Sequence, residues 1–186
     1  GWGRNRNGAA TWVGAHNTHG RKAEPTHGRN TTIILTYNKR SKKMKKQVLV
    51  TGANKGIGYE IARHLGKSGW QVVVGARCED RALKAMEALR AEGADVAGWQ
   101  YVNLADNGEI EVSAREIAEK YPGLSLLVNN AGIPGDMSVR SYEQSLQDVI
   151  DTVQVNYIGT FYLTKLLLPL LEKNQGRICN ITVPST

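Results

Sequence analysis

The sequence has 186 residues, of which 41% are apolar, and this is enough for one globular domain. Its two cysteines cannot form a disulfide framework, so we expect a reducing, cytoplasmic setting. No stretch approaches the roughly 18 consecutive apolar residues of a transmembrane helix, so we expect no membrane partner. The formal charge of +7 suggests nucleic acid as a partner, unless that charge lies outside the globular part.

The excess charge lies in residues 1–43. This segment holds nine Lys and Arg against one Glu, a net charge of +8, whereas the rest of the chain carries −1. It has no helical or alternating apolar period, so we expect disorder, and its three histidines fit no metal spacing. Because the first methionine is Met44, we expect residues 1–43 to be a disordered or non-native extension. The alternative is a basic arm for nucleic acid or an acidic membrane, but Trp2 and Trp12 form no stacking pattern with the arginines.

Residues 44–186 are expected to form the organised part of the chain, with short apolar runs alternating with amphipathic segments. The runs predicted as strands are 47–51, 71–74, 98–102, 124–128 and 177–181. Continuous apolar strands that alternate with helices are typical of a parallel sheet covered on both faces. We therefore predict an α/β fold with a doubly wound, Rossmann-type parallel sheet, whose ligand crevice lies at the carboxyl ends of the strands.

Four helices are predicted between these strands. Two of them have an apolar face, formed by Ile57, Ile61, Ala62 and Leu65 in the first and by Leu83, Met86, Ala88 and Leu89 in the second. A more polar helix is expected over 108–120, and a long helix over 145–171.

A glycine-rich loop joins the first strand to the first helix. It runs from Thr51 to Gly58 and contains Gly52, Gly56 and Gly58. Glycines at this point let the backbone approach a pyrophosphate held at the helix N-terminus. A glycine triplet also fits a plain strand-to-helix turn. Its place between a predicted strand and a predicted helix favours cofactor binding.

Three motifs together resemble the short-chain dehydrogenase/reductase family. They are the spacing Gly-x-x-x-Gly-x-Gly after Thr51, the run Asn-Asn-Ala-Gly at 129–132, and Asn-x-x-Gly at 156–159. The resemblance covers about residues 46–183, the first half to two thirds of a family domain, and 51–58 is most similar to the carbonyl-reductase branch. It implies an oxidoreductase that moves a hydride between a nicotinamide cofactor and a small carbonyl or alcohol substrate.

The end of the second strand indicates which cofactor is used. An NAD site places an acidic residue there for the ribose 2′-hydroxyl, whereas an NADP site has cations for the 2′-phosphate. This chain has Arg77 at that place and no carboxylate before Glu79, and Lys55 lies in the glycine loop. The two cations also fit ordinary surface charges. Their joint position favours NADP(H).

The resemblance implies a set of cofactor-binding residues. Asn103 stands where the family usually has an Asp that contacts the adenine, and an amide can make a similar contact. The full predicted set is Gly52, Asn54, Lys55, Gly56, Ile57, Gly58, Arg77, Asn103, Asn130, Ala131 and Gly132.

Only part of the family's catalytic group is expected in this chain. The family uses a Tyr, a Lys four residues later, a Ser and an Asn, of which Asn156 matches the Asn. An Asn there also fits an amide in a kinked helix. The family's Ser position falls on Val183, so Ser185 is the candidate if the strand end is shifted by two residues. The Tyr and Lys are absent, since Tyr162 and Lys165 are one residue too close, so we expect an inactive fragment.

Two further readings stay open at this stage. The first is a non-catalytic dinucleotide-binding module or sensor, which a Tyr-x-x-x-Lys motif beyond Thr186 would disfavour. The second is a nucleic-acid binder that acts through residues 1–43. We expect the full-length protein to be a monomer or homo-oligomer, and the fifth strand to be an exposed edge that is prone to aggregation.

Overall fold

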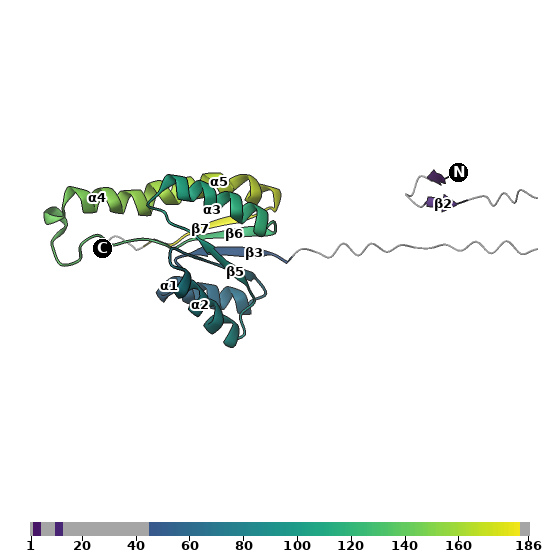
Figure 1. Cartoon of the computed structure of the whole chain (residues 1–186), viewed down its shortest axis with the longest axis horizontal. Coiled ribbons are helices and arrows are strands. Elements are labelled where there is room, and N and C mark those ends of the chain that lie inside the picture. Colours follow the sequence, from purple (N-terminus) through teal and green to yellow (C-terminus); the bar gives the residue numbers. More distant parts are fainter. Residues whose placement is uncertain (1, 5–9, 13–44, 183–186) are drawn as a thin grey trace, which may run out of the picture. The chain divides into compact units, whose positions relative to one another are not determined.

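The computed structural model describes residues 2–4, 10–12 and 45–182, and the chain divides into two units, Gly1–Lys43 and Met44–Thr186 (Figure 1). In the first unit, β1 (Trp2–Arg4) and β2 (Ala10–Trp12) pair antiparallel, which the sequence analysis did not predict. The other residues of 1–44, including the three histidines, lie outside the described residues. The expected disorder of the segment therefore stays a prediction.

The second unit is built on a five-stranded sheet in which every pair of neighbours is parallel. The strands are β3 (Gln47–Thr51), β4 (Gln71–Ala76), β5 (Val96–Tyr101), β6 (Leu124–Asn129) and β7 (Arg177–Asn180). Their order is β5-β4-β3-β6-β7, so the chain leaves β3 first toward one edge and then toward the other. This confirms the predicted doubly wound sheet and puts the change of direction between β3 and β6, where such folds bind ligands.

Helices cover both faces of the sheet (Figure 1). They are α1 (Gly56–Lys67), α2 (Glu79–Ala91), α3 (Asn107–Lys120), α4 (Leu146–Val153), the π-helical turn η2 (Gln154–Gly159) and α5 (Thr160–Lys173), with a short 3-10 turn η1 (Ser141–Glu143). The α1 and α2 helices lie on one face, and α3 and α5 lie on the other. Val48 and Val50 of β3 pack toward α1 and α2, whereas Leu49 packs toward α3 and α5. Both faces of the strand are buried, which explains its continuous apolar run.

The apolar faces predicted for α1 and α2 coincide only in part with the faces that the two helices bury. Ile57, in the first turn of α1, is 66% exposed. Leu83 is 46% exposed and Ala88 is also exposed. The residues that α2 buries are Ala82, Ala85, Met86 and Leu89. Two stripes with the same helical period fit this sequence, and the small alanines are the ones that let the helix approach the sheet closely.

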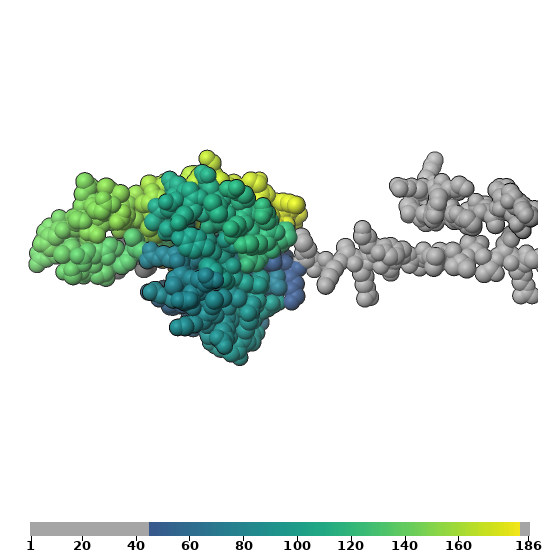
Figure 2. All heavy atoms as spheres, viewed as in Figure 1, coloured from purple at the N-terminus to yellow at the C-terminus, as the bar shows by residue number. Residues whose placement is uncertain are grey.

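The long predicted helix is interrupted rather than continuous. Ser145 caps α4, the π-helical turn η2 follows, and α5 continues to Lys173. Gly159 ends this turn against the loop after β5, where a Cβ atom would lie 2.1 Å from the carbonyl oxygen of Leu104. The α4 helix buries none of its residues, and its atoms (light green) project from the body of the unit in Figure 2.

The predicted exposed edge of the sheet is observed at β7, all four residues of which are exposed. No helix in residues 45–182 is both long and apolar enough to cross a bilayer. Within the same residues, no three metal-ligating side chains come together in a way that suits a metal ion.

Candidate cofactor site

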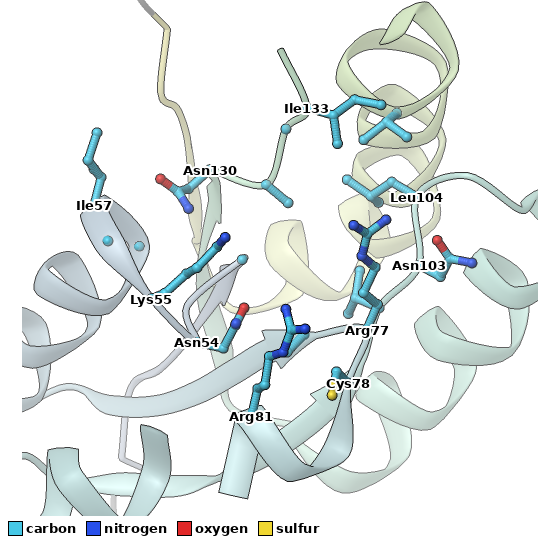
Figure 3. Close-up of a pocket in the computed structure, with 18 of the residues that line it drawn as sticks. Asn54, Lys55, Ile57, Arg77, Cys78, Arg81, Asn103, Leu104, Asn130 and Ile133 are labelled. Atoms are coloured by element: carbon cyan, nitrogen blue, oxygen red, sulfur yellow. The ribbon is translucent and has the colours of Figure 1, made fainter. Parts of the chain in front are cut away.

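A cavity of about 710 Å³ opens at the carboxyl ends of β3, β4, β5 and β6 (Figure 3). This volume is in the range of small-molecule and cofactor sites. The cavity brings together all of the predicted cofactor residues: Gly52, Asn54, Lys55, Gly56, Ile57, Gly58, Arg77, Asn103, Asn130, Ala131 and Gly132. It is also lined by residues that the sequence analysis missed, which are Ala76, Cys78, Arg81, Val102, Leu104, Ile133, Pro134 and Val155.

The glycine loop closes tightly around the end of β3. Gly52 and Gly56 have φ angles of +68° and +57°, in the left-handed region that favours glycine. A Cβ atom on Gly58 would lie 2.4 Å from Nδ2 of Asn130 and 2.5 Å from the carbonyl oxygen of Gly52. Glycine at position 58 therefore lets the start of α1 pack against two neighbouring loops and leaves its backbone open to the cavity.

Thr51 joins this loop to the segment that follows β6. Its buried Oγ1 donates to the carbonyl oxygen of Val128 at 3.3 Å and accepts from the backbone N–H groups of Asn130 and Ala131, both at 3.0 Å. In return, Nδ2 of Asn130 donates to the carbonyl oxygen of Thr51 at 2.9 Å. The Asn130 side chain thus holds two walls of the cavity together.

Asn156 lies in the π-helical turn and does not line the cavity. Its Oδ1 accepts from the Ile133 N–H and its Nδ2 donates to the Ile133 carbonyl, each at 2.8 Å. The amide therefore fixes the wall of the cavity at Ile133. A catalytic role for Asn156 stays a prediction. Ser185 lies outside the described residues, and the Tyr162 hydroxyl hydrogen-bonds to Glu111 instead of facing the cavity.

Three cations occupy one part of the cavity. Figure 3 shows the side chains of Lys55, Arg77 and Arg81 extending into it, with Asn54 beside them. None of the three forms an ion pair with a carboxylate of the described residues. No Asp or Glu lines the cavity. This part of the site is therefore suited to an anion. The sequence analysis did not include Arg81. The signal that could have indicated it is its position four residues after Arg77, near the start of a predicted helix.

Asn103 lines the cavity, but its amide is engaged elsewhere. Its Nδ2 donates to Glu109 at 2.7 Å, and its Oδ1 accepts from the Ala105 N–H at 3.2 Å. The Tyr101 hydroxyl donates to the same Glu109 carboxylate, and this bond raises the pKa of Tyr101. The predicted contact between Asn103 and adenine is neither confirmed nor contradicted by this arrangement, and it stays a prediction.

Two helices begin at the cavity without a side-chain cap. The N-cap residues, Lys55 of α1 and Cys78 of α2, accept no hydrogen bond through their side chains. The first N–H groups of a helix have no partner within the helix, and they favour negative charge nearby. Backbone donors of both helices are therefore left for groups other than the N-cap side chain, at the same place as the three cations.

Comparisons with known proteins agree with this geometry. The family model described as short chain dehydrogenase matches residues 46–186. The chain is 38% identical over 143 residues to the 3-oxoacyl-(acyl-carrier-protein) reductase FabG of Staphylococcus aureus. The matched region covers 75% of this chain and 56% of that protein. The chain thus spans about half the length of the curated relatives it matches.

Solved structures give the same result. An actinorhodin polyketide ketoreductase with NADPH is 37% identical, with a TM-score of 0.66 over 73% of this chain and 52% of its own. An alcohol dehydrogenase from the archaeon Thermococcus sibiricus, complexed with 5-hydroxy-NADP, is 28% identical with a TM-score of 0.65, over 73% of this chain and 57% of its own. With the parallel sheet, the glycine loop and the family match over three quarters of the sequence in agreement, this chain belongs to the short-chain dehydrogenase family.

Proposed function

We propose that the cavity binds NADP(H), and that the full-length protein transfers a hydride between this cofactor and a small carbonyl or alcohol substrate. The observation that carries the cofactor proposal is the set of three cations, Lys55, Arg77 and Arg81, which line the cavity and form no ion pair with a carboxylate of residues 45–182. The matched relatives include reductases, and two of the similar structures hold NADPH or a modified NADP.

The residues of the cavity fit a dinucleotide along its whole length. The backbone of Gly52, Gly56 and Gly58 would hold the pyrophosphate against the N-terminus of α1, which has no side-chain cap. This turn requires glycine at position 58, because a Cβ atom there would clash with the Gly52 carbonyl. Asn130, Ala131 and Gly132 would line the nicotinamide side, where Thr51 and Asn156 fix the backbone. When bound, the cofactor would supply the hydride from its nicotinamide ring.

The adenosine end supports NADP(H) over NAD(H). An acidic residue at the end of β4 would accept a hydrogen bond from the ribose 2′-hydroxyl, and it would repel a 2′-phosphate. Here that position is Arg77, whose planar guanidinium can bind two phosphate oxygens at once, while Lys55 contributes a point charge.

The catalytic proposal extends to residues beyond this sequence. None of the seven tyrosines is followed by a lysine four residues later, so we expect the 186-residue chain to bind cofactor without turning substrate over. We propose that a Tyr-x-x-x-Lys motif, which reading the coding sequence beyond Thr186 would reveal, supplies the proton donor of a carbonyl-reductase-like enzyme in the cytoplasm. A continuation without this motif would overturn the enzyme proposal and leave the binding proposal intact.

A titration tests the cofactor proposal directly. We expect the chain to bind NADPH more tightly than NADH, and Arg77→Asp to reverse this preference, because the new carboxylate suits the 2′-hydroxyl and repels the phosphate. The matched control is Lys84→Asp, which makes the same change of charge on α2 at a residue that does not line the cavity. Equal affinities for the two cofactors in the unaltered chain would contradict the proposal.

A further inference from the structure

We propose that Gln154 is a positioning residue that couples the two ends of the cavity. Through the π-helical turn η2, it ties the wall at Leu104, on the side of the predicted adenine contact, to the wall at Ile133, on the nicotinamide side. A nucleotide bound at the adenine end therefore orders the nicotinamide end before the ring arrives there. This inference rests on the proposed binding of NADP(H), and it adds a residue that does not itself line the cavity.

The amide of Gln154 holds the loop that follows β5. Its Nε2 donates to the carbonyl oxygen of Leu104 at 3.3 Å and to Oδ1 of Asn107, the first residue of α3, at 3.1 Å. The Leu104 side chain is buried and lines the cavity, next in sequence to Asn103, for which an adenine contact is predicted. Figure 3 shows Leu104 and Ile133 on different segments of the cavity wall. Gln154 is thus tied to a residue that a bound nucleotide would touch.

The other end of η2 lies against the same carbonyl group. Gly159 is the last residue of the turn, and a Cβ atom on it would lie 2.1 Å from the Leu104 carbonyl oxygen. Between these two ends, Val155 is buried and lines the cavity. Because one carbonyl group contacts both the first and the last residue of the turn, the loop after β5 fixes the orientation of the whole turn.

Two residues after Gln154, Asn156 carries this orientation to the opposite wall. Its Oδ1 accepts from the Ile133 N–H and its Nδ2 donates to the Ile133 carbonyl, each at 2.8 Å. A Cβ atom on Gly132 would lie 3.1 Å from the same Oδ1, so the amide also packs closely against the segment after β6. The contacts therefore form a continuous chain from the Leu104 carbonyl, through η2, to the Ile133 backbone.

A π-helical turn provides the alternative arrangement that such coupling needs. It inserts one residue into an α-helix, and such turns are frequent at functional sites. Loss of the insertion would rotate one side of the helix by about 100° relative to the other, and the Asn156 amide would leave the Ile133 backbone. The adjoining α4 buries none of its residues, so it can follow this change without disturbing the core. A nucleotide that contacts the loop after β5 stabilises the arrangement in which Gln154 keeps its bonds.

The test follows hydrogen exchange of the Ile133 amide, because this N–H donates to Asn156 at the far end of the chain of contacts. The probe is adenosine 2′,5′-bisphosphate, which has the phosphates of the adenine end and no nicotinamide. We expect it to slow this exchange about fivefold or more in the unaltered chain, as for coupling between two sites. In Gln154→Leu, which removes the donor and keeps an apolar side chain of similar size, the slowing should fall below about twofold. The core amides of β4 show in each variant how far the ligand stabilises the whole fold.

The matched control is Gln147→Leu on α4. The Nε2 of Gln147 donates to Asp151 at 2.8 Å within that helix, so its loss should leave the slowing of Ile133 exchange unchanged. Gln154→Lys keeps a donor that can reach the same acceptors, and it should restore part of the slowing. Affinity provides a second readout. Gln154→Leu should weaken NADPH binding about fivefold and bisphosphate binding less than about twofold, since only the whole dinucleotide uses the ordered nicotinamide wall.

The outcomes separate this inference from the cofactor proposal. Equal slowing of Ile133 exchange in Gln154→Leu and in the unaltered chain would overturn the coupling and leave NADP(H) binding standing. Equal losses of affinity for NADPH and for the bisphosphate would show that Gln154 only supports the fold, and would also overturn its positioning role. If Gln154→Leu does not fold, the unaltered chain decides, because a bound bisphosphate that leaves Ile133 exchange unchanged contradicts the inference. A chain that binds neither ligand would contradict the proposed cofactor itself, and the inference would fall with it.

Discussion

Helices α1 and α2 differ from α3 and α4 in how they begin. The N-terminus of α3 is capped by Asp106, which accepts from the Glu109 N–H at 2.9 Å, and that of α4 by Ser145, which accepts from the Asp148 N–H at 3.1 Å. The α1 and α2 helices begin at the cavity with Lys55 and Cys78, neither of which caps the helix through its side chain. The chain therefore satisfies helix donors away from the cavity and leaves them open at it.

This difference shows that some helix starts in the fold contribute to stability, whereas others are available to bind a ligand. A side-chain cap contributes about 1 kcal/mol to the stability of a helix, so two uncapped helices have a cost to the free protein. The same uncapped N–H groups attract an anion, and a ligand bound there raises the stability of the folded protein. Adding a cap to a helix that begins at the cavity should thus raise stability and weaken nucleotide binding. Removing a cap from a helix that begins elsewhere should lower stability and leave binding unchanged.

The largest effect is expected from adding a methyl group to the first turn of α1. The Cβ atom of Gly58→Ala would meet the carbonyl oxygen of Gly52 at 2.5 Å. We expect a loss of about 2 kcal/mol in the free energy of unfolding and no measurable nucleotide binding, because the backbone must shift. Urea unfolding and NADPH titration measure these two quantities.

The matched control places the same substitution in the first turn of α3. A Cβ atom on Gly108 would meet only Oδ1 of Asp106, at 3.3 Å. Gly108→Ala should therefore leave stability unchanged or raise it by up to about 1 kcal/mol through helix propensity, with nucleotide affinity unaltered. Similar losses at both helices would show that the tight glycine turn is not special to the cavity.

The next effect is expected from introducing a cap at α2. Cys78 has an extended backbone, with φ −137° and ψ 116°, which suits an N-cap residue. Cys78→Asp should raise the free energy of unfolding by about 0.5–1 kcal/mol and weaken NADPH binding strongly, since the carboxylate would lie beside Arg77. Cys78→Asn offers a cap without the charge, so it should gain similar stability and lose less affinity. If Cys78→Asn lost as much NADPH affinity as Cys78→Asp, the loss would come from the geometry of the new cap and not from its charge.

The sequence predicted those parts of the site that are local in the chain. The glycine loop, Asn130 and Arg77 each adjoin the end of a strand, so strand order alone brings them to one edge of the sheet. Arg81 was missed because its approach depends on the direction of a helical side chain. Ile57 was expected both on the apolar face of α1 and in the cofactor site, and it lines the cavity. An apolar period does not distinguish a residue facing a ligand site from one facing the core.

Other features could not be inferred from apolar pattern at all. The π-helical turn at Gln154–Gly159 adds a residue to the helix without changing its hydrophobic character, so a continuous helix was predicted. The turn directs the Asn156 amide to the Ile133 backbone, a contact between residues 23 positions apart in sequence. Such contacts depend on tertiary packing, which a single sequence does not display.

A smaller effect is expected where a cap is removed away from the cavity. Asp106→Ala should lower the free energy of unfolding by about 1 kcal/mol, because the Glu109 N–H loses its acceptor. Nucleotide affinity should not change, since Asp106 does not line the cavity. Asp106→Asn retains an acceptor and should recover most of the stability. Reduced NADPH affinity in Asp106→Ala would indicate that the start of α3 also contributes to the site.

The smallest effect concerns pH and the attachment of α3 to the sheet. The Glu116 carboxylate accepts one hydrogen bond from the Gln100 amide at 2.9 Å and another from the Lys120 ammonium at 2.7 Å. These bonds lower the pKa of Glu116. A carboxyl whose pKa is lower in the folded state stabilises the fold above its unfolded pKa of about 4.3, and this contribution is lost as the pH falls through the folded pKa.

Glu116→Gln should therefore be slightly less stable than the unaltered chain at pH 7, and the difference should disappear in acid. Urea unfolding at several pH values between neutral and acidic measures it, with Glu119→Gln as the control on the same helix. The difference should be the same with and without nucleotide, because Glu116 holds α3 to β5 and does not line the cavity. A pH-dependent difference that vanished in the presence of NADPH would couple α3 to the site and remove the distinction between the two pairs of helices.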